Sequence, residues 1–226
     1  DDIVLFTALI RPELMAPWLG QLSKARVPLV GIYSVPVVSQ DLLPKLPGEG
    51  RDVLLVTLQG AGGIRQTFFS NGKLKISRLA VAPPMDATRQ APYVLGEVEN
   101  VRRYLNSLRL LQPGAPLDVV LLTGRRLLND LKRQVSDTLA VRFHLLDLQD
   151  VGRSVGCKTP LNTPYADALF AHMLARTSPS NYYANSEDTH FMRLYRARGA
   201  LSAGAILLLL TTMGYSGFQF VQSLLT

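Results

Sequence analysis

The stretch VLLVTLQGAGGIRQTFFSNGKLKISRL, residues 53–79, decides the fold predicted for this chain. Three short apolar runs follow one another in it: residues 53–58, 64–69 and 73–79. The Asn71-Gly72 pair between the last two runs is a strong β-hairpin signal, because both residue types tolerate the positive φ angles of a tight turn. The stretch therefore predicts a three-stranded antiparallel meander.

Helices and strands alternate after the meander. A loop rich in proline and alanine leads to a predicted long helix over residues 94–111, whose apolar positions recur three and four residues apart. The elements expected beyond it are a strand at 118–123, a helix at 125–138, a strand at 141–146 and a helix at 165–176. Alternation around a meander favours an α/β layered fold with a mixed sheet.

The segment before the meander is predicted to be β-α-β-α. Its elements are a buried strand at 3–10, a helix that opens at Pro12 and continues to Leu22, a buried strand at 28–33 and a short helix at 37–46. The chain starts without an initiator Met or a signal peptide. We therefore expect a fragment, which begins inside a larger fold and ends inside or at the edge of a membrane.

Residues 199–226 carry no charged side chain. As a helix these 28 residues would extend about 42 Å at ~1.5 Å per residue, against about 30 Å of hydrocarbon in a bilayer. Three arginines stand just before the segment: Arg193, Arg196 and Arg198. Because such basic flanks stay on the cytoplasmic side, the pattern predicts a transmembrane helix with residues 1–192 in the cytoplasm. The alternative is the core helix of a soluble domain, which Gln219 and Gln222 favour.

Composition excludes several classes of protein. Hydrophobic residues make up 47% of the 226 residues, so the chain can bury a core and is not disordered. Cys157 is the only cysteine, which excludes a disulfide scaffold, and with three scattered histidines no metal site is expected. The net charge of +7 comes without a dense basic run. No nucleic-acid binding is therefore predicted.

Two glycine positions are candidates for ligand binding. In the run from Gly60 to Gly63, Gly62 and Gly63 could bring backbone N–H groups to a phosphate. The alternative is a plain hairpin turn, because the Walker Lys-Ser/Thr pair is missing and a strand follows. Gly124 ends a predicted strand, where α/β folds bind ligands, although an ordinary strand-to-helix connection has the same sequence.

No catalytic residue is predicted. Ser34 and Ser77 have no histidine near them in sequence, and the G-x-S-x-G motif is absent. Glu97 and Glu99 stand two residues apart on a helix, so they point to different faces and do not form a pair. His144 lies among apolar neighbours and is interpreted as a satisfied interior or edge histidine.

Three stretches resemble the cytoplasmic actin-like proteins of bacterial type IV pilus and type II secretion assembly platforms, the PilM and GspL families. They are residues 2–8 with 27–34, the meander 53–79, and the strand and turn 119–124. The resemblance implies an α/β, actin-like (ribonuclease H-like) fold of mixed sheets with flanking helices, plus one C-terminal transmembrane helix. The expected parts are the end of a first subdomain truncated upstream (1–47), a second subdomain (51–176), a juxtamembrane tether (177–198) and the transmembrane helix (199–226).

The resemblance implies a bitopic scaffold in the bacterial inner membrane. Its expected partners are other platform proteins, an assembly ATPase, the membrane itself and, left open, a second copy in a homodimer. Nucleotide-hydrolysing actin-like proteins carry Asp then Gly at the end of the strand that reads Val56-Thr-Leu-Gln-Gly60 here. No ATP hydrolysis is therefore expected, and ATP binding stays open. The alternatives are a nucleotide-responsive ATPase and a membrane-tethered sensor with a small ligand at Gly124.

Tyr182 and Tyr183 form an aromatic pair inside a polar linker. Leaving them in water costs roughly 25 cal/mol per Å² of apolar surface. We therefore expect the linker to dock both tyrosines into a groove on the domain. The alternative is a flexible spacer with two incidental tyrosines.

Overall fold

The computed structural model describes residues 11–48, 52–60, 62–112, 114–177 and 183–225. The chain divides into two compact units. The first, called the α/β unit here, comprises the described residues from 34 to 177, and the second, called the helical unit, comprises those of 11–33 and 183–225. The strand predicted at residues 3–10 lies outside the described residues.

A five-stranded mixed sheet forms the middle of the α/β unit, with the strand order β3-β2-β1-β4-β5. The strands are β1 (Asp52–Gln59), β2 (Gly63–Ser70), β3 (Lys73–Val81), β4 (Leu117–Thr123) and β5 (Val141–Asp147). β2 runs antiparallel to β1 and β3, whereas β4 runs parallel to β1 and β5. The predicted meander and mixed sheet are confirmed.

The turn between β2 and β3 sets the register of that hairpin. Asn71 and Gly72 have φ angles of 51° and 71°, which are the two positive values that a type I′ turn requires. Ser70 consequently pairs with Lys73 directly across the turn.

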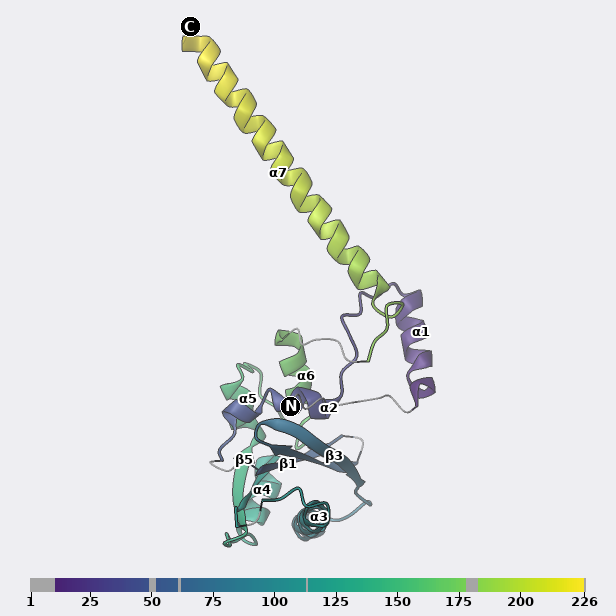
Figure 1. Cartoon of the computed structure of the whole chain (residues 1–226), viewed down its shortest axis with the longest axis vertical. Helices are drawn as coiled ribbons and strands as arrows, with labels where there is room; N and C mark the ends of the chain where they lie inside the picture. Colours follow the sequence, from purple (N-terminus) through teal and green to yellow (C-terminus); the bar gives the residue numbers. More distant parts are fainter. Residues whose placement is uncertain (1–10, 49–51, 61, 113, 178–182, 226) are drawn as a thin grey trace. The chain divides into compact units, whose positions relative to one another are not determined.

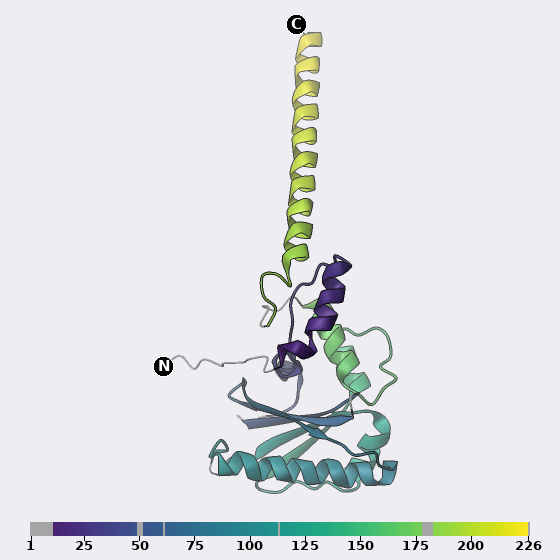
Figure 2. The same ribbon diagram turned by 90° about the vertical axis from the view of Figure 1, so that its right-hand side faces the viewer.

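Helices cover both faces of the sheet (Figures 1 and 2). One face carries α3 (Ala87–Ser107) and α4 (Arg125–Lys132), and the other carries α2 (Val35–Gln40), α5 (Leu148–Ser154) and α6 (Asp167–Arg176). A short 3₁₀ turn, Leu43–Lys45, follows α2. Because α2 packs against α6 and β3, the residues just before the meander belong with the sheet.

The main core lies between the sheet and α3 with α4. It contains buried side chains from every strand except β3, and from both helices; among them are Leu54, Phe68, Val98, Leu105, Leu121 and Leu131. All seven residues of β4 are buried, because a strand covered on both faces has no polar side. Asp118 is the one charged residue among these buried residues of β4. Its Oδ1 lies 2.9 Å from Nε2 of His144 on β5. The interpretation of His144 as a satisfied histidine is confirmed.

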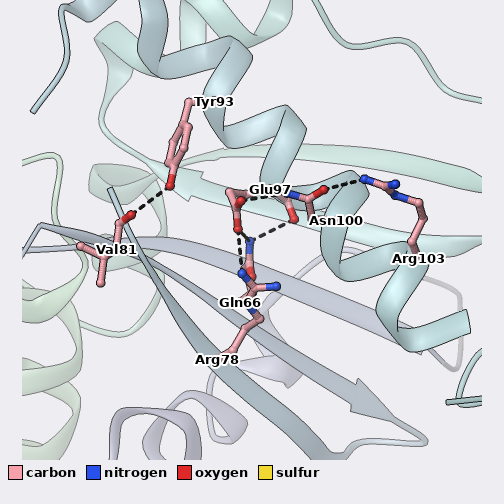
Figure 3. Close-up of polar contacts among 7 residues, drawn as sticks. All are labelled: Gln66, Arg78, Val81, Tyr93, Glu97, Asn100 and Arg103. Carbon is pink, nitrogen blue, oxygen red and sulfur yellow. Dashed lines mark hydrogen bonds and ion pairs between the residues drawn. The ribbon is translucent and has the colours of Figure 1, made fainter. Parts of the chain in front are cut away.

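Glu97 ties α3 to the meander (Figure 3). Arg78 Nη2 donates to its Oε2 at 3.0 Å, and Gln66 Nε2 donates to its backbone oxygen at 3.1 Å. On the next turn of α3, Asn100 Nδ2 donates to Glu97 Oε1 at 2.9 Å. Glu99 instead pairs on the surface with Arg102, whose hydrogen bond lowers the pKa of Glu99. The prediction that the two glutamates do not form a pair is confirmed.

Three elements that follow the meander differ from the predictions. α3 begins at Ala87, seven residues earlier than predicted, and runs through Pro92, because Ala91 and Val94 on either side of that proline are buried against the sheet. α5 was not predicted; Asp147 Oδ1 accepts from the N–H of Gln149 and so caps its first turn. The predicted helix 125–138 ends at Lys132.

The strand predicted at residues 28–33 is wrong: these residues are irregular. Val30 is 42% exposed, and the N–H of Leu29 turns back to the carbonyl oxygen of Val27. The carbonyl oxygen of Ile32 accepts from the N–H of Tyr183 at 3.4 Å, a contact within the helical unit. An apolar run becomes a strand only where a neighbouring strand completes its hydrogen bonds.

Two helices dominate the helical unit. The short turn Pro12–Leu14 and α1 (Ala16–Lys24) confirm the helix predicted from Pro12. α7 (His190–Leu225) is long and apolar enough, over His190–Ser223, to span a membrane. The large apolar side chains from Leu194 to Val221 are exposed, which a core helix of a soluble domain would not show.

We predict that Glu97→Ala lowers the free energy of unfolding of the α/β unit by about 1–2 kcal/mol, because it removes hydrogen bonds that charged groups share. Glu99→Ala is the matched control on the same helix, and its exposed pair should change stability by less than about 0.5 kcal/mol. Urea denaturation of the detergent-solubilised chain, followed by far-UV circular dichroism, measures both. Equal losses for the two variants would contradict this role of Glu97.

Candidate ligand-binding cleft

The carboxyl ends of β1, β4 and β5 meet at one edge of the sheet, because the three strands run parallel. Two adjoining clefts open there. The larger has a volume of about 800 Å³ and is lined from α4, α5 and the loop 161–164. The smaller has a volume of about 320 Å³ and is lined from the β1–β2 hairpin and residues 82–85. Gln90 of α3 lines both clefts.

The structure brings the candidate glycines to this edge. Gly124 lines the larger cleft, and Gly62 and Gly63 line the smaller one. They come from two turns more than 60 residues apart in sequence, and the parallel pairing of β1 with β4 places both turns at the same edge. This is the position where open α/β sheets bind ligands.

Asp147 organises the larger cleft. Its Oδ2 accepts from Arg125 Nε at 3.0 Å, and its Oδ1 accepts from the N–H of Gln149 at 2.9 Å. The carboxylate is 10% exposed, whereas the Arg125 side chain is 74% exposed. Asp147 therefore joins the end of β5 to the first turns of α4 and α5, and it holds the Arg125 guanidinium at the cleft.

The larger cleft is slightly cationic. Its charged lining residues are Arg125, Arg126, Arg153, Asp130 and Asp147. Arg126 has no ion pair with any residue in the described part of the chain. Such a lining suits a small anionic group better than a cation.

The smaller cleft is more apolar. Met85, Tyr93 and Tyr165 line it together with the side-chain amide of Gln90. The hydroxyl of Tyr93 donates to the carbonyl oxygen of Val81 at 3.0 Å and is held in place (Figure 3). Two aromatic side chains beside an amide suit a flat or apolar group with a few hydrogen-bonding atoms.

Each candidate glycine also has a structural reason to be glycine. Gly62 has a φ of +81°, which other residues rarely adopt. A Cβ on Gly63 would lie 2.6 Å from Cδ1 of Leu79 on the neighbouring strand. A Cβ on Gly124 would lie 3.2 Å from the Cα of Pro164.

Two amides of the β1–β2 hairpin, those of Gly60 and Gly62, are already engaged within the protein. The N–H of Gly60 donates to Asp167 Oδ2 at 2.7 Å, and the N–H of Gly62 donates to the carbonyl oxygen of Gln59 at 3.0 Å. These two N–H groups would have to exchange partners before they could hold a phosphate. The anionic Asp167 beside them also disfavours a phosphate.

Sequence reasoning missed Asp167. It is the first residue of α6, and its carboxylate holds the end of β1 to that helix. Its charge also acts on Arg65 of β2: burial lowers the pKa of the Arg65 guanidinium, and Asp167 partly offsets that effect. The available signal was an acidic residue in the first turn of a predicted helix, which alone names no partner.

The remaining predicted residues lie in the helical unit or outside the described residues. Tyr182 lies outside them. Tyr183 is half-buried, and its N–H donates to the Ile32 oxygen; its docking on the α/β unit stays a prediction. The three predicted arginines stand on α7 itself: Arg193, Arg196 and Arg198. Arg193 Nη2 also donates to the carbonyl oxygen of Ser186 at 2.7 Å.

Among the described residues, no group of three or more His, Cys, Asp or Glu side chains could hold a metal ion. Comparisons of the chain with protein-family models, with curated proteins and with solved structures find no match. The structure itself defines the class: a mixed α/β unit with a cleft at the carboxyl edge of its sheet, in one chain with a helix able to span a membrane.

We predict that Gly124→Ala lowers the free energy of unfolding by about 1–3 kcal/mol, because the new methyl group is forced against the backbone of Pro164. Gly96→Ala is the control: no atom lies within 4 Å of a Cβ there, and alanine should stabilise α3 by about 1 kcal/mol. Denaturation curves of the two variants measure these shifts. A neutral Gly124→Ala would show that Pro164 does not pack closely against this turn.

Proposed function

We propose that this chain is a bitopic inner-membrane scaffold whose degenerate actin-like domain recruits cytoplasmic machinery to a type IV pilus or type II secretion assembly platform. One observation above all supports the proposal. A single chain contains both the α/β unit, with its antiparallel meander, and the helix α7, whose apolar segment is preceded by arginines. A scaffold of this kind has to hold a folded domain at a membrane. A fused tether would keep that domain beside its partners at high effective concentration.

The order of elements supports an actin-like, ribonuclease H-like unit. An antiparallel meander, a long helix and then parallel crossover strands is the succession that the resemblance implies for the second actin-like subdomain. β1, β2 and β3 supply the meander, α3 the long helix, and β4 and β5 the crossover strands. Helices on both faces agree with this assignment.

Three features support a scaffold over an ATPase. β1 ends in Gln59, so the strand carries no carboxylate where a hydrolysing relative has one. The carboxylate beside the end of β1 is that of Asp167, and it already accepts a hydrogen bond from the N–H of Gly60. The N–H of Gly62 is engaged as well.

A second candidate function rests on the larger cleft. Its volume of about 800 Å³ and its arginine-rich lining beside Gly124 support a nucleotide-responsive protein or a sensor of a small anionic ligand. Nucleotide binding without hydrolysis would be compatible with a scaffold that switches between partners. Nucleotide hydrolysis would instead indicate an ATPase.

The arginines before the apolar segment support the orientation. Arg193, Arg196 and Arg198 lie at the N-terminal end of α7, and positively charged flanks stay on the cytoplasmic side. The α/β unit would then face the cytoplasm. Its partners there would be platform proteins and an assembly ATPase, with a homodimer as a further state to test.

We predict that the purified full chain releases no phosphate from Mg²⁺–ATP above the rate of a protein-free control, because β1 ends in Gln59 and not in a carboxylate that could orient an attacking water. Phosphate release at saturating ATP measures this. Asp167→Asn is the informative variant, since Asp167 is the carboxylate beside the hairpin. ATP turnover by the parent chain that is lost in Asp167→Asn would contradict the scaffold proposal and favour an ATPase.

A further inference from the structure

The helical unit carries an exposed apolar pair near the start of the described chain. Leu14 is 66% exposed and Trp18 is 74% exposed. The two residues stand four apart, across the junction of the Pro12–Leu14 turn and α1, so their side chains neighbour each other on one face. We call this pair the Trp18 patch. A tryptophan and a leucine exposed together mark an interaction surface.

Three basic residues lie near the Trp18 patch in sequence. Arg11 precedes it, Lys24 ends α1, and Arg26 follows two residues later. None of the three has an ion pair with another described residue. Glu13 is the only acidic residue between positions 11 and 33. The segment 11–33, which contains the patch, therefore carries a net positive charge.

The Trp18 patch is linked to the start of α7. The N–H of Tyr183 donates to the Ile32 oxygen at 3.4 Å, and α7 begins seven residues after Tyr183. Seven residues lie between Lys24, the last residue of α1, and Ile32, and the eight Cα–Cα steps that join the two span at most about 29 Å. α1 and the start of α7 are thus connected within one compact unit.

We propose that α1 lies on the cytoplasmic surface of the membrane, with Leu14 and Trp18 inserted at the interface. Arg11, Lys24 and Arg26 would then contact the phosphates of anionic glycerophospholipids. The inference rests on the proposed function in one respect, that α7 spans the membrane.

Two physical arguments favour a lipid surface as the occupant. Tryptophan is enriched at membrane interfaces, where its apolar ring and its N–H are both accommodated. Basic side chains beside an apolar helix face are attracted by the negative surface potential of anionic lipids. A protein partner would need acidic groups to match the three cations, and it becomes one outcome of the test.

The experiment uses the fact that Trp18 is the only tryptophan, so intrinsic fluorescence reports on this patch without labels. The full chain is reconstituted into vesicles of phosphatidylethanolamine and phosphatidylglycerol, with or without lipids brominated near the headgroup. We expect a blue-shifted emission that loses most of its intensity to the brominated lipids and little to aqueous iodide. Emission typical of water, quenched by iodide and not by brominated lipid, would overturn the proposal.

Charge variants separate lipid attraction from burial against protein. Lys24→Glu with Arg26→Glu should shift Trp18 emission toward that of water and restore much of the intensity lost to brominated lipid. Lys132→Glu with Lys158→Glu, a pair of exposed residues in the α/β unit, is the matched control and should change neither. Blue-shifted emission that brominated lipid does not quench would show that a protein surface covers the patch, which also overturns the proposal.

Failure of this inference can be told apart from failure of the proposed function. Resistance of the chain to alkaline extraction from the same vesicles reports on α7 alone. Extraction of the chain would refute the membrane span. A chain that resists extraction while Trp18 stays accessible to iodide refutes only the surface position of α1.

Discussion

The parallel pairing of β1 with β4 is the constraint on which the rest of the α/β unit depends. It joins the antiparallel meander to the crossover strands in one sheet, with Val53 opposite Asp118 and Thr57 opposite Leu122. Because both strands end at the same edge, the hairpin with Gly62 and the turn at Gly124 border adjoining clefts. Both faces of the two strands are covered by helices, so all apolar side chains of β4 are buried, as are those of β1 except the partly buried Val53 and Leu58.

Much of this fold could be predicted from local sequence. Asn71-Gly72 determines its turn through backbone conformation alone, and the strand 118–123 is apolar enough to be buried on both faces. Other features depend on partners far away in the chain. Residues 28–33 have the composition of a strand but pair with no strand of the described residues. α3 runs through Pro92 because packing outweighs local propensity. Asp167 could not be assigned, since its role depends on Gly60, 107 residues away.

The candidate site shows the same division between local and long-range information. The glycines could be chosen from sequence, yet whether they serve a ligand depends on what their backbone groups already bind. The N–H groups of Gly60 and Gly62 have partners within the protein, whereas the larger cleft beside Gly124 is open and carries Arg126 without an ion pair among the described residues. A ligand would therefore find more unused hydrogen-bonding capacity at the end of β4 than at the hairpin.

In the proposed function, α7 holds the α/β unit at the cytoplasmic face of a membrane. Topology reporters fused before Arg11 and after Leu225 test it most directly, because one reporter is active only in the cytoplasm and the other only after export. We expect a cytoplasmic signal from the first fusion and an exported signal from the second. Replacing Arg193, Arg196 and Arg198 by Glu should weaken this preference. A cytoplasmic signal from both fusions, or an exported signal from the first, would contradict it.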